Sequence, residues 1–180
     1  MLVRKTEISE VLVIELPVFE DPRGFFFESF NSKIFAEAGI SGIFVQDNQS
    51  FSKHGVLRGL HYQKGSSAQA KIVRVLSGNV IDIVVDIRKG SPTFGKWVSE
   101  ELSGENRRQL YIPRGFAHGF AVISETAEFF YKCDNYYSRE SEAGIRFDDP
   151  DLDIDWKIDR AGLIISEKDL ALPFLKDAVL

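Results

Sequence analysis

Residues 71–87 read KIVRVLSGNVIDIVVDI. β-Branched and aliphatic residues dominate both halves, which predicts one strand over Lys71–Leu76 and a second over Val80–Ile87. Ser77-Gly78-Asn79 lies between them and is typical of a hairpin turn. Successive strand residues face opposite sides. The second run therefore separates into one face of Ile81, Ile83, Val85 and Ile87 and another of Val80, Asp82, Val84 and Asp86.

Similar runs recur along the chain. We expect further strands over Val11–Leu16, Leu110–Ile112, Gly119–Ile123 and Ala127–Lys132. Clusters of turn-forming residues separate the strands, for example at residues 88–92, 103–106 and 113–115. Many short strands with regular turns predict an all-β fold, a jelly-roll antiparallel barrel or sandwich.

Helical signals are few. Ser32–Ala38 predicts two helical turns, with Asn31 or Ser32 as the cap and Gly39 as the stop. Ser166 begins a second short helix near the C-terminus. We expect one domain over residues 1–180, with a jelly-roll core over about 11–135 and a short helical segment over about 160–180.

Composition excludes several classes of protein. The net charge of -5 disfavours a nucleic-acid-binding protein, which carries a basic patch or stripe. The single cysteine, Cys133, cannot form an internal disulfide, as is usual in a reducing compartment. The sequence shows no signal-peptide pattern and no apolar run long enough to cross a bilayer. We therefore predict a cytoplasmic protein with no membrane partner.

Three histidines raise the question of a metal site: His54, His61 and His118. Residues 113–118, PRGFAH, resemble the second metal-site motif of the cupin superfamily, whose histidine is a ligand. The first cupin motif needs a His-x-His pair, but His61 is followed by Tyr62 and Gln63. Lys71 stands where a carboxylate ligand would follow, and a cation there repels a divalent ion. We therefore expect no metal.

Six segments together resemble the dTDP-4-dehydrorhamnose 3,5-epimerase family, a metal-free branch of the cupins, over nearly the whole chain. The segments are DPRGFFFE at 21–28, QDN at 46–48, GVLRGLHYQ at 55–63, PRGFAHG at 113–119, the tyrosines 131, 136 and 137, and SEKD at 166–169. Each motif is weak alone, but their order and spacing are highly specific.

The resemblance implies an epimerase that works without a cofactor. Its substrate would be dTDP-4-dehydro-6-deoxy-D-glucose, inverted at C3 and C5 to dTDP-4-dehydro-6-deoxy-L-mannose in dTDP-L-rhamnose biosynthesis. The resemblance also implies a homodimer in which N-terminal strands pair across subunits. Arg23 and Glu28 would then serve the partner's active site.

The resemblance assigns catalytic roles to four residues. A ketone acidifies the hydrogens on both neighbouring carbons, and inversion needs a base on one face and an acid on the other. His61 would be the base, held by Asp169, because imidazole can accept a proton near neutral pH. Tyr131 would be the acid, since a phenol is protonated at pH 7. Lys71 would stabilise the negative charge that develops on the ketone oxygen.

Each of these residues also has a plain structural interpretation. His61 could be a core histidine, and Asp169 could close a capping box with Ser166. Tyr131 could fill the core, and Lys71 could be a strand-edge lysine that limits aggregation.

The family pattern assigns the other site residues to substrate binding. A nucleoside diphosphate is best met by arginine and lysine. Arg23, Arg58 and His118 would lie near phosphates or sugar, with help from Lys168. Hydrogen bonds to thymine or sugar would come from Glu28, Gln46, Asn48 and Glu142. Tyr137 would stack on the base, although Tyr136 could take its place.

Other functions stay open at this point. A close relative could epimerise one carbon only, or isomerise the keto sugar. From other classes, the same barrel could be a non-catalytic nucleotide-sugar binder or a metal-dependent cupin oxygenase.

Overall fold

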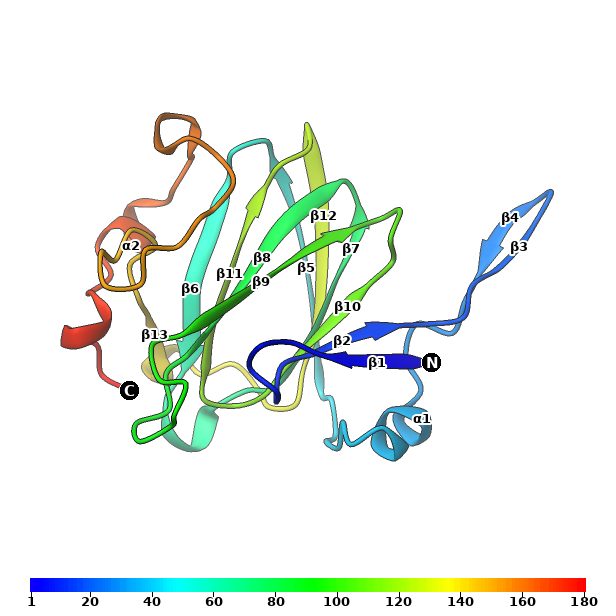
Figure 1. Cartoon of the computed structure of the whole chain (residues 1–180), viewed down its shortest axis with the longest axis horizontal. Coiled ribbons are helices and arrows are strands. Elements are labelled where there is room, and N and C mark those ends of the chain that lie inside the picture. Colours follow the sequence, from blue (N-terminus) through cyan, green and yellow to red (C-terminus); the bar gives the residue numbers. More distant parts are fainter.

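The computed structural model describes residues 1–180 and consists mainly of two antiparallel sheets that face each other (Figure 1). In spatial order the six-stranded sheet contains β1 (Leu2–Lys5), β2 (Leu12–Glu15), β10 (Gln109–Ile112), β7 (Lys71–Ser77), β12 (Thr126–Cys133) and β5 (Gln46–Lys53). The five-stranded sheet contains β13 (Glu142–Gly144), β6 (Leu57–Gln63), β11 (Phe116–Val122), β8 (Asn79–Asp86) and β9 (Trp97–Ser103). The predicted cupin-like all-β fold is confirmed.

The five-stranded sheet is covered on both faces, as its interior strand β8 shows. Val80 and Val84 belong to the core between the two sheets. Ile81, Ile83 and Val85 belong to a second core, between this sheet and the C-terminal segment. The predicted alternation of β8 is therefore confirmed, and its two apolar faces serve two different layers.

The predicted hairpin at Ser77-Gly78-Asn79 is wrong. β7 pairs with β10 and β12, whereas β8 pairs with β9 and β11 in the other sheet. The turn therefore carries the chain from one sheet to the other. A local turn signal cannot distinguish these outcomes, because the strand pairs of a jelly roll are distant in sequence.

The predicted strands are all present within a few residues of their expected ends. Three long strands had no prediction: β5, β6 and β9. β5 reads QDNQSFSK and alternates between half-buried and exposed residues. Its inward positions are polar because they line a cavity, so hydrophobic alternation cannot reveal the strand.

The helices are short. α1 (Ser32–Glu37) begins at Asn31, whose side chain accepts hydrogen bonds from the backbone N–H groups of Lys33 and Ile34. It ends just before Gly39, which has a φ of +85°. α2 (Glu167–Leu170) begins at Ser166. Single 3-10 turns cover Gly65–Ser67, Arg139–Ser141, Arg160–Gly162 and Leu175–Asp177. None of the helices reaches the length and hydropathy that crossing a bilayer requires.

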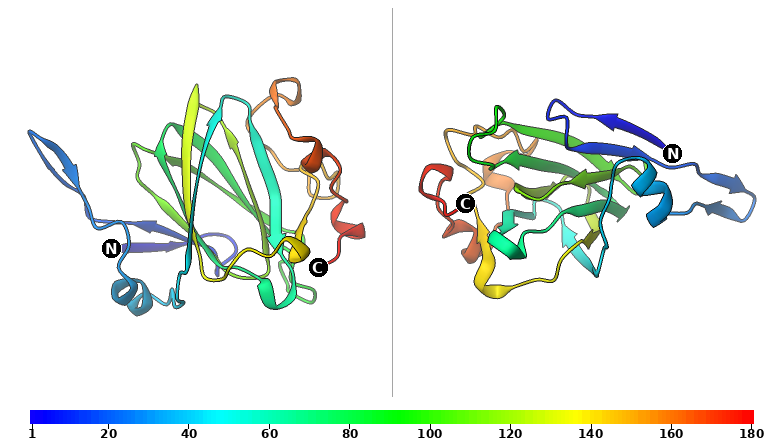
Figure 2. Two further views of the ribbon diagram at one scale, coloured as in Figure 1. Left: turned by 180° about the vertical axis from the view of Figure 1, so that it is seen from behind. Right: turned by 90° about the horizontal axis from the view of Figure 1, so that it is seen from below.

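A two-stranded arm, β3 (Phe19–Asp21) with β4 (Gly24–Phe26), projects from the body (Figures 1 and 2). The rings of Phe19 and Phe26 are 66% and 70% exposed. Arg107 holds the arm through an ion pair with Glu20 and lies 4.1 Å from the ring centroid of Phe25. The arm thus presents two rings, Phe19 and Phe26, that its own chain leaves largely exposed.

Candidate active site

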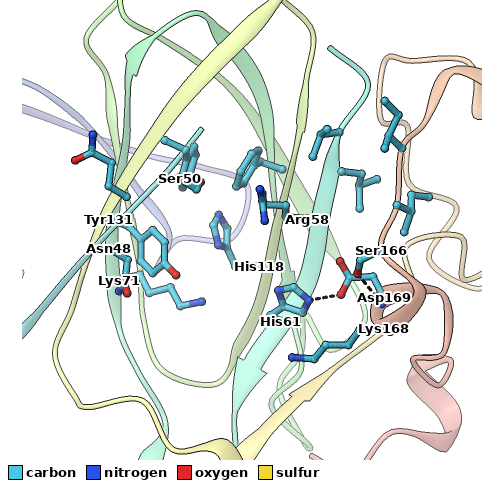
Figure 3. A pocket seen from close by; sticks show the side chains of 17 residues that line it. Asn48, Ser50, Arg58, His61, Lys71, His118, Tyr131, Ser166, Lys168 and Asp169 are labelled. Atoms are coloured by element: carbon cyan, nitrogen blue, oxygen red, sulfur yellow. Dashed lines mark hydrogen bonds and ion pairs between the residues drawn. The ribbon is translucent and has the colours of Figure 1, made fainter. Parts of the chain in front are cut away.

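A cavity of about 610 Å³ lies between the two sheets and is closed on one side by the C-terminal segment (Figure 3). This volume is ordinary for a site that takes a small molecule. Eight residues predicted for the site line it together: Asn48, Arg58, His61, Lys71, His118, Tyr131, Lys168 and Asp169.

His61 and Asp169 form a hydrogen-bonded pair. His61 lies on β6, and its Nε2 is 2.7 Å from Asp169 Oδ1. The Asp169 backbone N–H donates to Ser166 Oγ, so Ser166 caps the helix, but the Asp169 carboxylate contacts His61 and does not close a capping box. Burial acts to raise the pKa of Asp169, but the hydrogen bond and charge of His61 outweigh it and hold that pKa below its usual range. With Nε2 bound to the carboxylate, Nδ1 is the nitrogen left to accept a proton.

Tyr131 lies on the opposite sheet. It occupies β12, where it pairs with Asn48 of β5, and its side chain enters the same cavity as His61 (Figure 3). Burial raises the pKa of Tyr131 to about 12. The phenol therefore keeps its proton over the whole pH range in which the protein would work.

Lys71 begins β7 and extends between these two groups (Figure 3). Its Nζ lies 5.7 Å from the centre of the Tyr131 ring. No carboxylate lies within ion-pair distance of this ammonium. Burial lowers the pKa of Lys71, and the charge of Asp82 opposes that shift.

His118 also enters the cavity and is paired with a residue that the sequence did not single out. Its Nε2 lies 2.9 and 3.0 Å from the two oxygens of Asp82 on β8. Asp82 is completely buried and does not line the cavity. The available signal was its position, since an acid on the apolar face of a strand needs a buried partner.

At the rim, Tyr137 is fixed by two contacts. Its hydroxyl donates to Glu142, and its backbone N–H donates to Gln46, each at 2.9 Å. Glu142 also forms an ion pair of 2.6 Å with Lys168. Tyr136 is more exposed, at 67%. Its backbone N–H donates to Asn135, but its hydroxyl has no hydrogen-bond partner. The rim therefore orients Tyr137 and not Tyr136.

Gln46 and Arg58 each make one further side-chain contact, Gln46 along β5 and Arg58 between the two sheets. The Gln46 side-chain amide donates to Asn48, which lines the cavity. Arg58 Nε donates to Ser52 Oγ across the gap. Arg58 forms no ion pair in the chain, so its guanidinium remains available to an anion.

Five predicted site residues do not line the cavity: Gln46, Tyr137 and Glu142 lie at its rim, and Arg23 and Glu28 lie elsewhere. Arg23 forms an ion pair with Asp21 on the arm, with 89% of its side chain exposed. Glu28 accepts a hydrogen bond from Asn31. Neither lines the cavity of its own chain.

The remaining walls are largely apolar and were not predicted. Phe120 and Phe129 stack at 4.1 Å between ring centroids, and Ile164 and Ile165 line the C-terminal side. Nothing in their sequence pattern separates them from ordinary core residues. No three His, Cys, Asp or Glu side chains gather in positions that could hold a metal ion.

Known proteins resemble this chain over its whole length. The family model described as dTDP-4-dehydrorhamnose 3,5-epimerase matches residues 5–177. The protein of that name from Shigella flexneri is 56% identical over 171 residues, which are 94% of this chain and 93% of its own.

Solved structures agree with this assignment. A dTDP-4-dehydrorhamnose 3,5-epimerase from Elizabethkingia anophelis is 57% identical, with a TM-score of 0.94 over 98% of this chain and 97% of its own. A dTDP-6-deoxy-D-glucose-3,5-epimerase from Legionella pneumophila, solved with dTDP-4-keto-L-rhamnose, is 52% identical, with a TM-score of 0.94 over 98% and 93%. This chain therefore belongs to the dTDP-4-dehydrorhamnose 3,5-epimerase family.

Proposed function

We propose that this protein inverts C3 and C5 of dTDP-4-dehydro-6-deoxy-D-glucose to give dTDP-4-dehydro-6-deoxy-L-mannose, a step of dTDP-L-rhamnose biosynthesis. Family membership over nearly the whole chain supports the reaction. One observation of the site supports the mechanism. His61 and Tyr131 project from opposite sheets into one cavity, and Lys71 lies between them (Figure 3).

The proposed chemistry is two rounds of proton removal and return. His61 Nδ1 takes the proton from the carbon next to the C4 ketone, and Asp169 stabilises the imidazolium that results. The electron pair moves onto the ketone oxygen, where the Lys71 ammonium stabilises the enolate. Tyr131 then gives a proton to the opposite face of the same carbon, and solvent restores both groups.

The rim would hold the nucleotide. Tyr137 stacks on the thymine while Glu142, Gln46 and Asn48 hydrogen-bond thymine or sugar groups. Arg58 and Lys168 face the diphosphate, and His118 contacts the sugar. Lys168 and Asp169 belong to the C-terminal segment but line the cavity of the barrel, so we propose that residues 1–180 act as one epimerase domain. We also propose that the protein acts in the cytoplasm.

We also propose a homodimer. Arg23 and Glu28 do not reach the cavity of their own chain, and the arm that carries Arg23 exposes apolar rings. An arm seated on a second copy would bury those rings and bring Arg23 and Glu28 to the partner's nucleotide.

The test is solvent exchange. In deuterated water, without added metal or nicotinamide, deuterium should enter C3 and C5, and NMR should show both centres inverted. His61→Asn should abolish exchange and leave dTDP affinity within about twofold, since the imidazole acts only on the sugar. Absence of exchange at both carbons in the unmodified protein would refute the proposal. Exchange at one carbon would identify a single-carbon epimerase, and binding without turnover would identify a binding protein.

A further inference from the structure

The cavity contains two His–Asp pairs with different surroundings. In the first, His61 has 33% of its side chain exposed and faces the substrate space. In the second, His118 and Asp82 are 8% and 0% exposed. The second pair lies inside the barrel, where an unpaired charge is costly. The mechanism above gives Asp82 no role, so its burial needs an explanation.

Asp82 lacks the partner that satisfies its neighbour on the same strand. Asp86, four residues along β8, is also completely buried and accepts hydrogen bonds from Arg88, Ser91 and Thr93. Asp82 contacts no guanidinium, and its hydrogen bonds come from His118 alone. Glu100, its cross-strand partner on β9, is already bound to Arg4 and Arg108.

The remaining charge near Asp82 is Lys71. Groups from four strands lie near this ammonium or line the same cavity: Tyr131 and Cys133 on β12, Asp82 on β8, His118 on β11 and His61 on β6. Burial raises the pKa of Cys133 to about 11 and that of Tyr131 to about 12, so neither is an anion near neutral pH. Asp169 is bound to His61 on the cavity's other side. Burial raises the pKa of Asp82 as well, while the charge and hydrogen bond of His118 and the charge of Lys71 oppose that rise. Asp82 is thus the buried carboxylate whose charge is coupled to both His118 and Lys71.

The contact with Asp82 also decides how His118 meets the substrate. A neutral imidazole that gives its Nε2 hydrogen to a carboxylate presents a lone pair at Nδ1. His118 Nδ1 has no hydrogen-bond partner in the chain. Arg107 Nε is the one side-chain nitrogen or oxygen that is both buried and without a partner, so His118 Nδ1 is accessible to solvent. A nitrogen in this state accepts a hydrogen bond and can recognise a sugar hydroxyl.

We infer that Asp82 is a positioning residue of the proposed epimerase: it keeps Lys71 protonated and holds His118 in the Nε2–H form that accepts a hydroxyl of the sugar. The inference rests on the proposed function for its effect on rate, but its charge balance and its tautomer can be measured without turnover.

The test compares Asp82→Asn with Asp86→Asn, a buried control on the same strand. Removing the Asp82 charge takes away an interaction that favours the protonated amine, so the pKa of Lys71 should fall. The alkaline limb of kcat should move down by about one to two pH units, and dTDP affinity should not change. Asp86→Asn should lower stability and leave that limb in place. A pH profile of Asp82→Asn that matches the unmodified protein, with only stability lost, would overturn the inference.

Two NMR measurements keep the outcome independent of activity and of the variant's folding. Nitrogen-15 spectra of the unmodified protein at pH 7 should show His118 protonated at Nε2 and bare at Nδ1. The opposite tautomer would overturn the inference even if Asp82→Asn did not fold. Where it folds, the Lys71 Nζ resonance should titrate at lower pH than in the unmodified protein. If the unmodified protein showed no exchange at C3 or C5, the proposed function would fail while these measurements still decided the role of Asp82.

Discussion

Asp169 does two jobs from one position. Its backbone N–H completes the start of α2 on Ser166, and its carboxylate holds His61 at 2.7 Å. Ser166 caps the helix through the Asp169 backbone N–H, while the carboxylate that a capping box would use is bound to His61 instead. The short helix gives the carboxylate a fixed position beside the imidazole.

Replacing Asp169 by Asn tests the second job alone. The amide has nearly the same shape and leaves the backbone bond to Ser166 in place, but it cannot stabilise the imidazolium. We expect kcat to fall by about 10²–10⁴-fold with little change in dTDP affinity. Steady-state kinetics and calorimetry check this, with the exposed Asp155→Asn as the control. A fall in kcat of less than threefold would contradict the role of Asp169.

At the scale of elements, the turn between β7 and β8 fixes how the two sheets are joined. Gly78 has a φ of +77°, and a Cβ there would lie 1.9 Å from the Thr126 carbonyl oxygen. A side chain at residue 78 would be strained by the positive φ and would clash with the Thr126 carbonyl oxygen. The transfer of the chain between sheets thus depends on a glycine at this position.

Gly78→Ala should therefore lower the free energy of unfolding by more than the strain of a left-handed residue, which costs about 1–3 kcal/mol. Gly90→Ala is the matched control, because Gly90 has a φ of +86° but open space around its Cβ position. Urea unfolding of both variants measures the difference. Equal losses would show that the close approach to Thr126 carries no energetic weight.

The same turn shows how far sequence reasoning reaches. Local signals identified β2, β7, β8, β10, β11 and β12, because these strands are rich in apolar side chains that pack in the cores. They failed for β5 and for the pairing of β7, because a cavity-lining strand is polar and jelly-roll pairing is not local. Asp82 was missed for a related reason: its importance depends on His118, which lies 36 residues away.

At the scale of the whole molecule, the single chain does not bring all the proposed site residues together. The cavity contains the four residues proposed for catalysis, yet Arg23 and Glu28 lie outside it. The exposed rings of Phe19 and Phe26 lie on the same arm as Arg23. A second copy that receives the arm accounts for both observations.

Mixing two inactive variants tests this arrangement. A chain with Arg23→Ala and Glu28→Gln lacks the arm's contribution, and a chain with His61→Asn lacks the base. If arms serve the partner, each mixed dimer has one site with both lesions and one with neither. An equal mixture allowed to exchange subunits should recover about a quarter of the unmodified activity. No recovery, with mixed dimers present by native mass spectrometry, would contradict an exchanged arm.

The central claim is that base and acid act from opposite faces of the sugar, and Tyr131→Phe in deuterated water tests it most directly. This variant keeps the ring and loses the proton donor, so His61 can still remove a proton but can return one only to the same face. We predict that recovered substrate gains deuterium next to the ketone while keeping its configuration, and that inverted product falls by at least about 10²-fold. Inverted product at the unmodified rate would contradict the account.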